Sequence, residues 1–280
     1  MSAPALPLER PPKPARALGQ MPMAKPTLLG PVRRRVKRVV LQAIDRGWFG
    51  LTPLKLHVVI CGFPRSGTTL LQLMAEAAFP EARVFGKERS GVAAAQNDWP
   101  GRHSLVISKR PDDIFWIDEI RECYQARGTR TQPRFVVSVR DPRAVLTSVH
   151  GMNRSVYWVT VERWRAVHEH YRYVRQFDDV ITVEYRDLVE RVLDVQQRLT
   201  AFIGRSPARR FDEYQSAVPA NFDTLALNGV RPLDSSTLDK WRAERHRERI
   251  RELLREMPEL PGRLIEMGYE RDTAWVQEYA

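Results

Sequence analysis

Residues 56–79 read LHVVICGFPRSGTTLLQLMAEAAF, and this stretch decides the fold. LHVVIC at 56–61 is a short apolar run, which is typical of a strand covered on both faces of a sheet. TTLLQLMAEAAF at 68–79 has the apolar spacing of a helix. Two glycines, Gly62 and Gly67, lie between the two segments. The stretch therefore predicts a strand, a glycine loop and a helix in direct succession.

The glycine loop departs from the usual phosphate-binding loop at one position. Gly62 and Gly67 meet the pattern G-x-x-x-x-G-K-[ST], and Thr69 fills its Ser/Thr position. Thr68 stands where the lysine belongs, and a cation occurs earlier, at Arg65. The free N–H groups and the dipole of a helix N-terminus attract phosphate-like groups. We therefore expect the loop to bind an anion other than the β- and γ-phosphates of ATP.

The rest of the chain continues as an alternation of strands and helices. Further strands are predicted at 82–85, 104–108, 134–139 and 180–184. Helices are predicted at 112–126, 141–150, 155–176 and 187–203. Strands that alternate with helices form a parallel sheet with helices on both faces. The predicted fold class is α/β, a P-loop-type three-layer domain with a central parallel sheet of about five strands.

Length and composition indicate one folded domain, which we assign to residues 52–280. The chain of 280 residues is long enough for an α/β domain with a substantial core. Residues 1–31 hold eight prolines without a helical or strand period, so we expect a disordered leader. The sequence has no apolar run that could span a bilayer, no signal-peptide pattern and only two cysteines. These features favour a soluble, cytoplasmic protein.

The net charge of +11 is concentrated near the N-terminus. Residues 1–50 carry ten Lys and Arg against two acidic residues, whereas the other 230 residues carry 35 basic and 32 acidic ones. The domain itself is therefore nearly balanced in charge. This distribution disfavours a nucleic-acid footprint over the whole domain and is compatible with a localised basic cleft.

Residues 32–48 are expected to form a basic amphipathic helix, and Pro31 suits its first turn. Apolar side chains fall along one face at helical spacing, and arginines occupy the rest. The apolar residues are Val32, Val36, Val39, Val40, Ala43 and Ile44. Two interpretations remain open. The helix docks its valine face on the domain, or it contacts a membrane surface or another polyanion.

Cationic segments follow several of the predicted strands. KRP follows the third strand at 109–111, RDPR follows the fourth at 140–143, and YRDL follows the fifth at 185–188. Ligands of parallel α/β sheets bind at the carboxyl ends of the strands. The crevice at this edge should therefore bind a strongly anionic ligand.

Together these segments resemble the sulfotransferases that use 3′-phosphoadenosine 5′-phosphosulfate (PAPS). The family's phosphosulfate loop has a Lys or Arg before S-G-T-T, as in RSGTT at 65–69. Its 3′-phosphate motif, an Arg followed eight residues later by a Ser, corresponds to Arg140 and Ser148 in RDPRAVLTS. YRDL matches a Y-x-D-L segment, and GVRPLDSSTLDKWR at 229–242 matches a basic, Ser/Thr-rich turn before a tryptophan. The resemblance covers about residues 55–245, with the motifs in the family's order.

The resemblance implies an enzyme that transfers a sulfuryl group from PAPS to an acceptor hydroxyl without a metal ion. Its catalytic residues would be Lys109, Glu88 and Arg65. Lys109 would touch the transferring sulfuryl group, and Arg65 would stabilise the departing phosphate, on which charge grows. The co-substrate would be bound by Arg65, Ser66, Gly67, Thr68, Thr69, Arg140, Ser148, Tyr185, Arg231 and Ser235.

The general base is open between two residues. Cytosolic family members have a histidine two residues after the strand-three lysine, but Pro111 occupies that position here. The K-x-P arrangement is closer to tyrosylprotein and many bacterial sulfotransferases, in which a glutamate after the second strand is the base. Glu88 in FGKERSG stands near that position, and His103 is the alternative. A surface ion pair with Lys87 or Arg89 is the non-catalytic interpretation of Glu88.

Two other classes of protein share parts of these patterns. A P-loop kinase or NTPase would use the glycine loop, but Thr68 and the lack of a convincing Walker B acid disfavour it. A non-catalytic polyanion binder would use the basic N-terminal region. The sequence does not specify the acceptor, although the bacterial resemblance favours a carbohydrate or a lipid-linked glycan.

Overall fold

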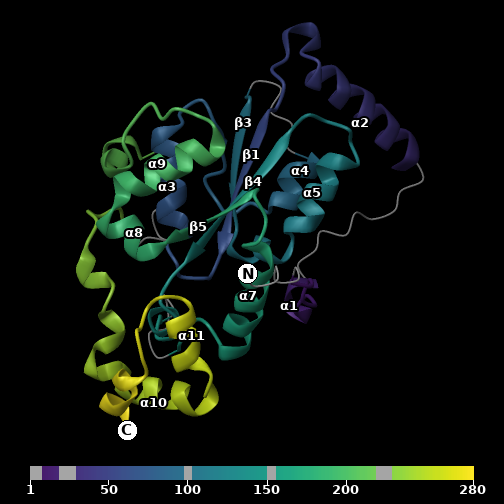
Figure 1. The fold of residues 1–280 in the computed structure, drawn as a ribbon. Coiled ribbons are helices and arrows are strands. Elements are labelled where there is room, and N and C mark those ends of the chain that lie inside the picture. Colours follow the sequence, from purple (N-terminus) through teal and green to yellow (C-terminus); the bar gives the residue numbers. More distant parts are fainter. Residues whose placement is uncertain (1–7, 19–29, 98–102, 150–155, 219–228) are drawn as a thin grey trace, which may run out of the picture.

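The computed structural model describes residues 8–18, 30–97, 103–149, 156–218 and 229–280. The described residues form one sheet of five parallel strands in the order β2-β3-β1-β4-β5 (Figure 1). The strands are β1 (Leu56–Gly62), β2 (Arg83–Val84), β3 (Leu105–Lys109), β4 (Gln132–Val139) and β5 (Val180–Glu184). The predicted parallel α/β sheet is confirmed, and each strand overlaps its predicted range.

Strand β1 lies at the centre of the sheet, between β3 and β4, and all of its residues are buried. Its side chains alternate between two apolar clusters. Val59 and Cys61 belong to one cluster, and Val58 and Ile60 belong to the other. Because successive side chains of a strand point to opposite faces, the clusters lie on opposite faces of the sheet. Burial on both faces explains the apolar run at 56–61.

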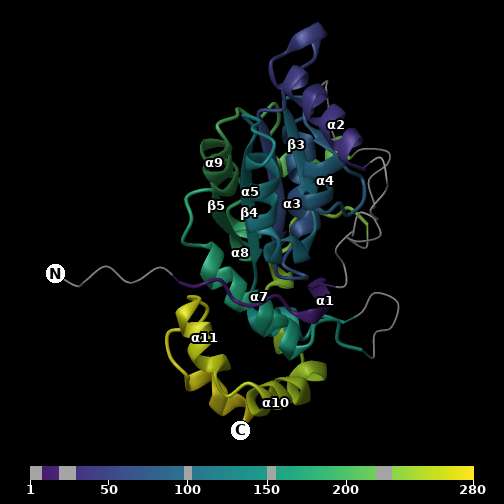
Figure 2. The same ribbon diagram turned by 90° about the vertical axis from the view of Figure 1, so that its right-hand side faces the viewer.

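Helices cover both faces of the sheet and produce three layers (Figures 1 and 2). The face of Val58 packs against α3 (Thr68–Ala78), α8 (Tyr185–Glu190) and α9 (Val192–Ile203). The face of Val59 packs against α4 (Gly91–Asn97), α5 (Ile117–Gln125) and α7 (Val161–Val174).

Local capping explains where these helices differ from the predicted ranges. The helix predicted at 112–126 is divided, because Pro111 begins a 3₁₀ helix, η2 (Pro111–Phe115), before α5. The helix predicted at 141–150 ends early as α6 (Pro142–Leu146). The helix predicted at 155–176 begins only at α7, where the Thr160 hydroxyl accepts a hydrogen bond from a backbone N–H. The prediction omits α4, whose seven residues are too few to show a helical period.

Part of the N-terminal leader contacts the domain. Arg10 lies 2.6 Å from the Glu119 carboxylate on α5, and Lys13 pairs with the same carboxylate. The short helix α1 (Ala15–Leu18) follows, and the segment crosses α7 in Figure 2. Residues 8–18 therefore have defined contacts, which differs from the disorder expected over 1–31. Residues 1–7 and 19–29 lie outside the described part of the chain.

Helix α2 (Gly30–Asp45) does not bury its valine face. The exposed fractions of Val36, Val39 and Val40 are 58%, 60% and 42%. The interpretation in which this face docks on the domain is therefore wrong for these three valines. The side chain of Val32 lies outside the described residues.

The end of α2 is attached to the amino-terminal edge of the sheet. The Asp45 carboxylate accepts a hydrogen bond of 3.1 Å from the backbone N–H of Arg130, just before β4 begins. The helix ends at Asp45 and not at 48, because Gly47 has a φ of 68° and leads into a 3₁₀ helix, η1 (Trp48–Gly50). None of the helices in the described ranges combines the length and hydrophobicity that crossing a bilayer requires.

The C-terminal residues form a helical lobe. It includes α10 (Arg247–Glu256), α11 (Leu260–Glu266) and the 3₁₀ helix η8 (Ala274–Tyr279). Its apolar side chains join the cluster to which α7 contributes. In Figure 1 the lobe lies below the sheet, at the end opposite to the attachment of α2.

A buried arginine joins this lobe to the end of β4. The Arg143 guanidinium donates to Asp141 at 2.8 Å and to Glu270 at 2.5 Å. Its central carbon lies 3.8 Å from the centre of the Trp241 ring and 4.7 Å from a ring of Trp275. Two carboxylates and two aromatic faces therefore compensate the buried charge.

Replacing Arg143 by alanine should destabilise the protein strongly. The change leaves the Asp141 carboxylate buried without its counter-charge, which typically costs about 3–5 kcal/mol in the free energy of unfolding. The matched control is Arg210→Ala, which removes an exposed pair with Asp212 and should leave the free energy of unfolding almost unchanged. Urea denaturation followed by circular dichroism compares the variants. A similarly small loss in both would mean that Arg143 does not hold the lobe.

Candidate functional site

The loop between β1 and α3 is shaped by close contact with the end of β4. Gly62 has a φ of 122°, and a Cβ there would lie 2.4 Å from the backbone oxygen of Ser138. The Ser138 hydroxyl donates to the backbone oxygen of Ser66 at 2.6 Å, and the Ser66 hydroxyl donates to that of Phe63 at 2.5 Å. Only glycine fits at position 62. The hydroxyl of Ser66, a predicted ligand residue, is used within the loop.

The first turn of α3 offers backbone donors at the end of this loop. Gly67 precedes the helix with a φ of 89°, and the turn contains no acidic residue. The first N–H groups of a helix have no carbonyl partner within it. Thr68 is buried and Thr69 is partly buried. An anion at this turn would be held mainly by backbone N–H groups and by the helix dipole.

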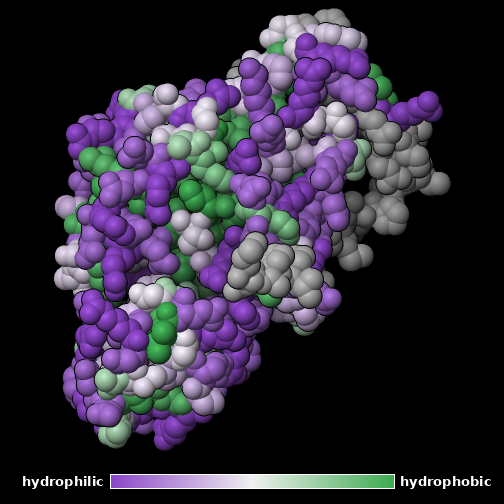
Figure 3. Space-filling model, viewed as in Figure 1, coloured by the Kyte–Doolittle hydropathy of each residue, from purple (hydrophilic) through white to green (hydrophobic). Residues whose placement is uncertain are grey.

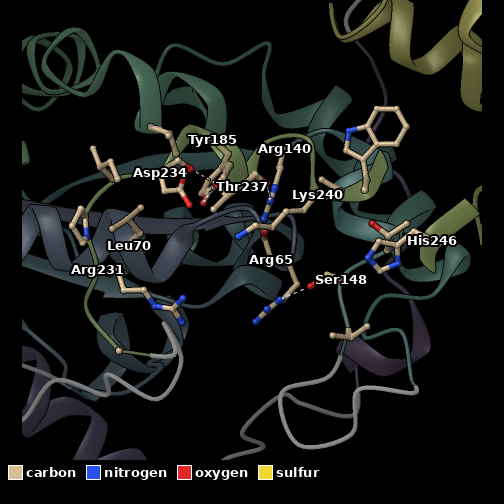
Figure 4. Close-up of a pocket in the computed structure, with 18 of the residues that line it drawn as sticks. Arg65, Leu70, Arg140, Ser148, Tyr185, Arg231, Asp234, Thr237, Lys240 and His246 are labelled. Atoms are coloured by element: carbon tan, nitrogen blue, oxygen red, sulfur yellow. Dashed lines mark hydrogen bonds between the residues drawn. The ribbon is translucent and has the colours of Figure 1, made fainter. Parts of the chain in front are cut away.

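Two arginines meet beside the loop (Figure 4). Arg65 has a φ of 66°, which few non-glycine residues adopt. Arg140, directly after β4, donates to the backbone oxygen of Arg65 at 3.0 Å and to that of Thr237 at 2.9 Å. The Arg140 guanidinium also lies over the Tyr185 ring, 4.2 Å from its centre. Segments that are distant in sequence thus meet at one point.

The charge of Arg140 is only partly compensated by the protein. Its Nε atom is buried and has no hydrogen-bond partner among the described residues. Burial lowers the pKa of Arg140, and the nearby charge of Arg65 adds to this lowering, while Tyr185 opposes it. A phosphate group would supply both an acceptor for Nε and the opposite charge.

Ser148 completes the group around Arg65. The Arg65 Nε donates to the Ser148 hydroxyl at 2.8 Å, and Figure 4 shows this contact below Arg140. The family resemblance predicts that Arg140 and Ser148 bind one phosphate together. In the structure both contact Arg65, Arg140 through the backbone oxygen and Ser148 through the side chain.

These residues line a pocket of about 370 Å³. Its described walls carry several cationic side chains and one carboxylate. The cations are Arg65, Arg140, Arg231, Lys240 and Arg245, and the carboxylate is that of Asp234. Such an excess of positive charge attracts an anion that carries several charges.

The pocket contains residues that the sequence analysis missed. Ser235 begins the 3₁₀ helix η5 (Ser235–Thr237) but does not line the pocket, whereas Thr237 does. The Thr237 hydroxyl also lies 3.3 Å from that of Tyr185. Lys240 is a second missed residue. Both occur in GVRPLDSSTLDKWR, but which positions of this turn face inward depends on how η5 folds.

A second charged cluster lies on the other side of the glycine loop. The Lys109 ammonium is 2.9 Å from the Glu88 carboxylate, and the exposed fractions of the two side chains are 4% and 56%. The backbone N–H of Arg89 donates to the backbone oxygen of Lys109 at 3.1 Å. Because β3 flanks β1 on the side opposite to β4, this pair and the pocket lie on either side of the loop. Glu88 thus pairs with Lys109. The non-catalytic interpretation had named Lys87 or Arg89 as its partner.

Asp113 connects the two segments that carry this pair. Its buried carboxylate accepts hydrogen bonds from the Gly91 N–H at 2.7 Å and from the Arg110 Nε at 2.9 Å. Burial raises the pKa of Asp113 to about 6, although both donors act in the opposite direction. Asp113 therefore holds the Glu88 loop against the end of β3. The sequence analysis gave it no role.

His103 lies near the opposite end of β3 from Lys109. Its Nδ1 is 3.0 Å from the backbone oxygen of Glu81. At roughly 3.3 Å per residue, the length of a five-residue strand separates His103 from the Lys109 end. Between the two candidate bases, this placement favours Glu88. No group of His, Cys, Asp and Glu in the described part of the chain is arranged to hold a metal ion.

No protein-family model and no curated protein matches the sequence. Matching solved structures include the sulfotransferase domain of the Synechococcus PCC 7002 olefin synthase, at 18% identity and a TM-score of 0.47, over 68% of this chain and 88% of that one. The sulfotransferase domain from the curacin biosynthetic pathway matches at 14% identity and a TM-score of 0.47, over 68% of this chain and 90% of that domain. A sulfotransferase from Alicyclobacillus acidocaldarius matches at 14% identity and a TM-score of 0.42, over 78% of this chain and 98% of that one. We therefore base the functional proposal on the residues of the site.

Gly67→Ala should weaken anion binding, and Gly128→Ala should not. Both glycines have positive φ values, 89° and 61°, so each substitution should cost roughly 1–2 kcal/mol of stability. At Gly67 a Cβ would lie 2.6 Å from the Tyr185 ring, whereas nothing lies within 4 Å at Gly128. Displacing Tyr185 also displaces Arg140. Affinity for inorganic pyrophosphate, measured by calorimetry, should fall about tenfold or more only in Gly67→Ala. Equal affinities in the two variants would contradict this account.

Proposed function

We propose that this protein is a sulfotransferase that moves a sulfuryl group from PAPS to an acceptor hydroxyl. The observation that carries the proposal is the contact of Arg65, the cation of the glycine loop, with both Arg140 and Ser148. PAPS has a 3′-phosphate and a 5′-phosphosulfate but no γ-phosphate, so a P-loop lysine would have little to contact. Cations at separate positions suit a ligand with two separated anionic groups.

The pocket on the β4 side of the loop suits the nucleotide. A 3′-phosphate would accept hydrogen bonds from the Arg140 Nε, which lacks a partner in the described part of the chain, and from the Ser148 hydroxyl. The Arg65–Ser148 hydrogen bond of 2.8 Å would be exchanged for contacts with the ligand. Arg65 and the first N–H groups of α3 would then face the phosphosulfate. Arg231 and Lys240 add positive charge along the wall.

Lys109 and Glu88 suit the chemistry on the other side of the loop. During transfer, the bond between the acceptor oxygen and sulfur forms while the bond between sulfur and the phosphate oxygen breaks. Glu88 would accept the hydroxyl proton. Lys109 would contact the sulfuryl oxygens, and Arg65 with the loop N–H groups would stabilise the charge on the departing phosphate. The 2.9 Å ion pair holds both side chains in place before the acceptor binds.

The acceptor class that we propose is a carbohydrate or a lipid-linked glycan. The K-x-P segment at 109–111 resembles the bacterial and tyrosylprotein-like branch of the family. The exposure of Glu88 is compatible with a hydroxyl that approaches from solvent.

Adenosine 3′,5′-bisphosphate should raise the melting temperature, and 5′-AMP should raise it far less. Stabilisation follows affinity, and only the bisphosphate carries the phosphate that we assign to Arg140 and Ser148. Arg140→Ala should lower the bisphosphate affinity by about 10–150-fold, since a charge-assisted hydrogen bond contributes about 1.5–3 kcal/mol. Scanning fluorimetry and titration calorimetry measure the two effects.

The exposed Arg210→Ala variant is the control for the loss of one positive charge. Equal stabilisation by the two nucleotides, or unchanged affinity in Arg140→Ala, would remove the 3′-phosphate assignment. Stronger stabilisation by ATP with Mg²⁺ than by the bisphosphate would favour a kinase or NTPase instead.

Glu88→Gln and Lys109→Ala should lower turnover while leaving nucleotide affinity within about threefold of the original. Glu88→Gln keeps the shape of the side chain and loses its basicity, so turnover should fall about 10²–10⁴-fold. Lys109→Ala should act on turnover because its partner charge is greatest in the transition state. Transfer of label from PAPS to acceptors in a cell lysate measures turnover, and bisphosphate titration measures affinity.

Glu81→Gln is the matched control, because Glu81 is an exposed carboxylate in the connection before β2, whereas Glu88 lies in the connection after it. Near-normal turnover in Glu88→Gln would exclude Glu88 as the base. An intact rate in Lys109→Ala at saturating PAPS would exclude contact with the sulfuryl group in the transition state.

A further inference from the structure

Helix α2 presents an apolar stripe to solvent. Val36, Val39 and Val40 are the exposed valines, and at 100° per residue they occupy about 100° of the helix circumference. Exposed valines at this spacing form an apolar surface, and such a surface often marks an interaction site. Trp48, just beyond the helix, is 50% exposed. Tryptophan combines an apolar ring with a polar N–H and is favoured at membrane interfaces.

The same helix carries most of the charge of the N-terminal region. Its sequence contains Arg33, Arg34, Arg35, Lys37 and Arg38. Arg35, whose side chain is described, is exposed. The acidic residue of the helix, Asp45, already accepts a hydrogen bond from Arg130 at the attached end. In Figure 3, hydrophobic atoms lie beside strongly hydrophilic ones along α2, at the upper right.

We propose that α2 binds the surface of a membrane that contains anionic lipids. The helix lies in the interface, with the exposed valines toward the acyl chains and the exposed Arg35 toward the lipid phosphates. Charge complementarity selects this occupant, because a second copy of the chain would place two strongly basic helices against each other. A nucleic acid would engage the cations but leave the valine stripe in water. The proposal does not depend on sulfuryl transfer.

Sedimentation with vesicles tests this proposal on the full-length protein. The protein should sediment with phosphatidylserine–phosphatidylcholine vesicles and not with pure phosphatidylcholine vesicles, and added salt should weaken the binding. Val36→Glu with Val39→Glu should lower the partition coefficient about tenfold or more. Two apolar side chains that would insert among the acyl chains become charged. Arg35→Glu should also lower the partition coefficient.

The control is Leu193→Glu, which places one negative charge, half of the charge added in the double variant, at a 40% exposed position on α9. It should leave vesicle binding unchanged, and all variants should keep the original melting temperature and bisphosphate affinity. The proposal is overturned by absent binding, by equal binding to neutral vesicles, or by no effect of the valine substitutions. Valine variants that dissociate an oligomer in sedimentation velocity, with vesicle binding unchanged, would identify a second copy as the occupant. Tighter retention by a poly(U) matrix than by anionic vesicles would identify nucleic acid.

Discussion

The close approach of Gly62 to Ser138 determines where the charged groups of the site lie. The two residues are paired in the register of β1 and β4, and the Phe63 N–H donates to the Ser138 oxygen at 3.0 Å. Any side chain at position 62 would push the loop away from β4. Arg140 follows Ser138 by two residues, so the same contact brings the backbone oxygen of Arg65 within its reach. Glycine at position 62 therefore allows the contact between Arg140 and the Arg65 backbone oxygen.

The segment RDPR divides its two arginines between structure and ligand binding. The Asp141 carboxylate accepts hydrogen bonds from the Arg143 side chain and caps α6 by accepting one from the Arg143 backbone N–H. Arg140 donates hydrogen bonds to two backbone oxygens and stacks on the Tyr185 ring. Because one arginine is paired with carboxylates and the other only with backbone oxygens and a ring, the segment anchors the C-terminal lobe and still offers a cation to the pocket. A partly buried cation without a carboxylate partner costs some stability, and binding of an anion restores it.

The sequence was most informative where local patterns determine structure. The apolar runs located the five strands, and their alternation with helices indicated parallel strands, whose following loops lie at one edge. Helix ends were less predictable, because the Thr160 cap and the Pro111 turn depend on single side chains. Contacts between distant segments could not be derived from spacing. The pairing of Glu88 with Lys109 and the bond from Arg140 to Thr237 arise only when loops from different strands meet. For the same reason the pattern of valines in α2 could not tell a docked face from an exposed one.

If α2 binds a membrane as proposed, its attachment to the amino-terminal edge of the sheet would fix the distance between the bilayer and the pocket. Asp45 is bonded to Arg130 just before β4, and Arg140 follows the other end of that strand. Eight extended residues span about 25 Å, so the strand acts as a spacer of this length between the attached helix and the pocket. With α2 on a bilayer and β4 along the bilayer normal, a hydroxyl in a lipid headgroup would lie about this distance below the pocket edge that carries Glu88. A sugar several units along a glycan chain would be at the right level, and the length of β4 would then select which unit of the chain is modified.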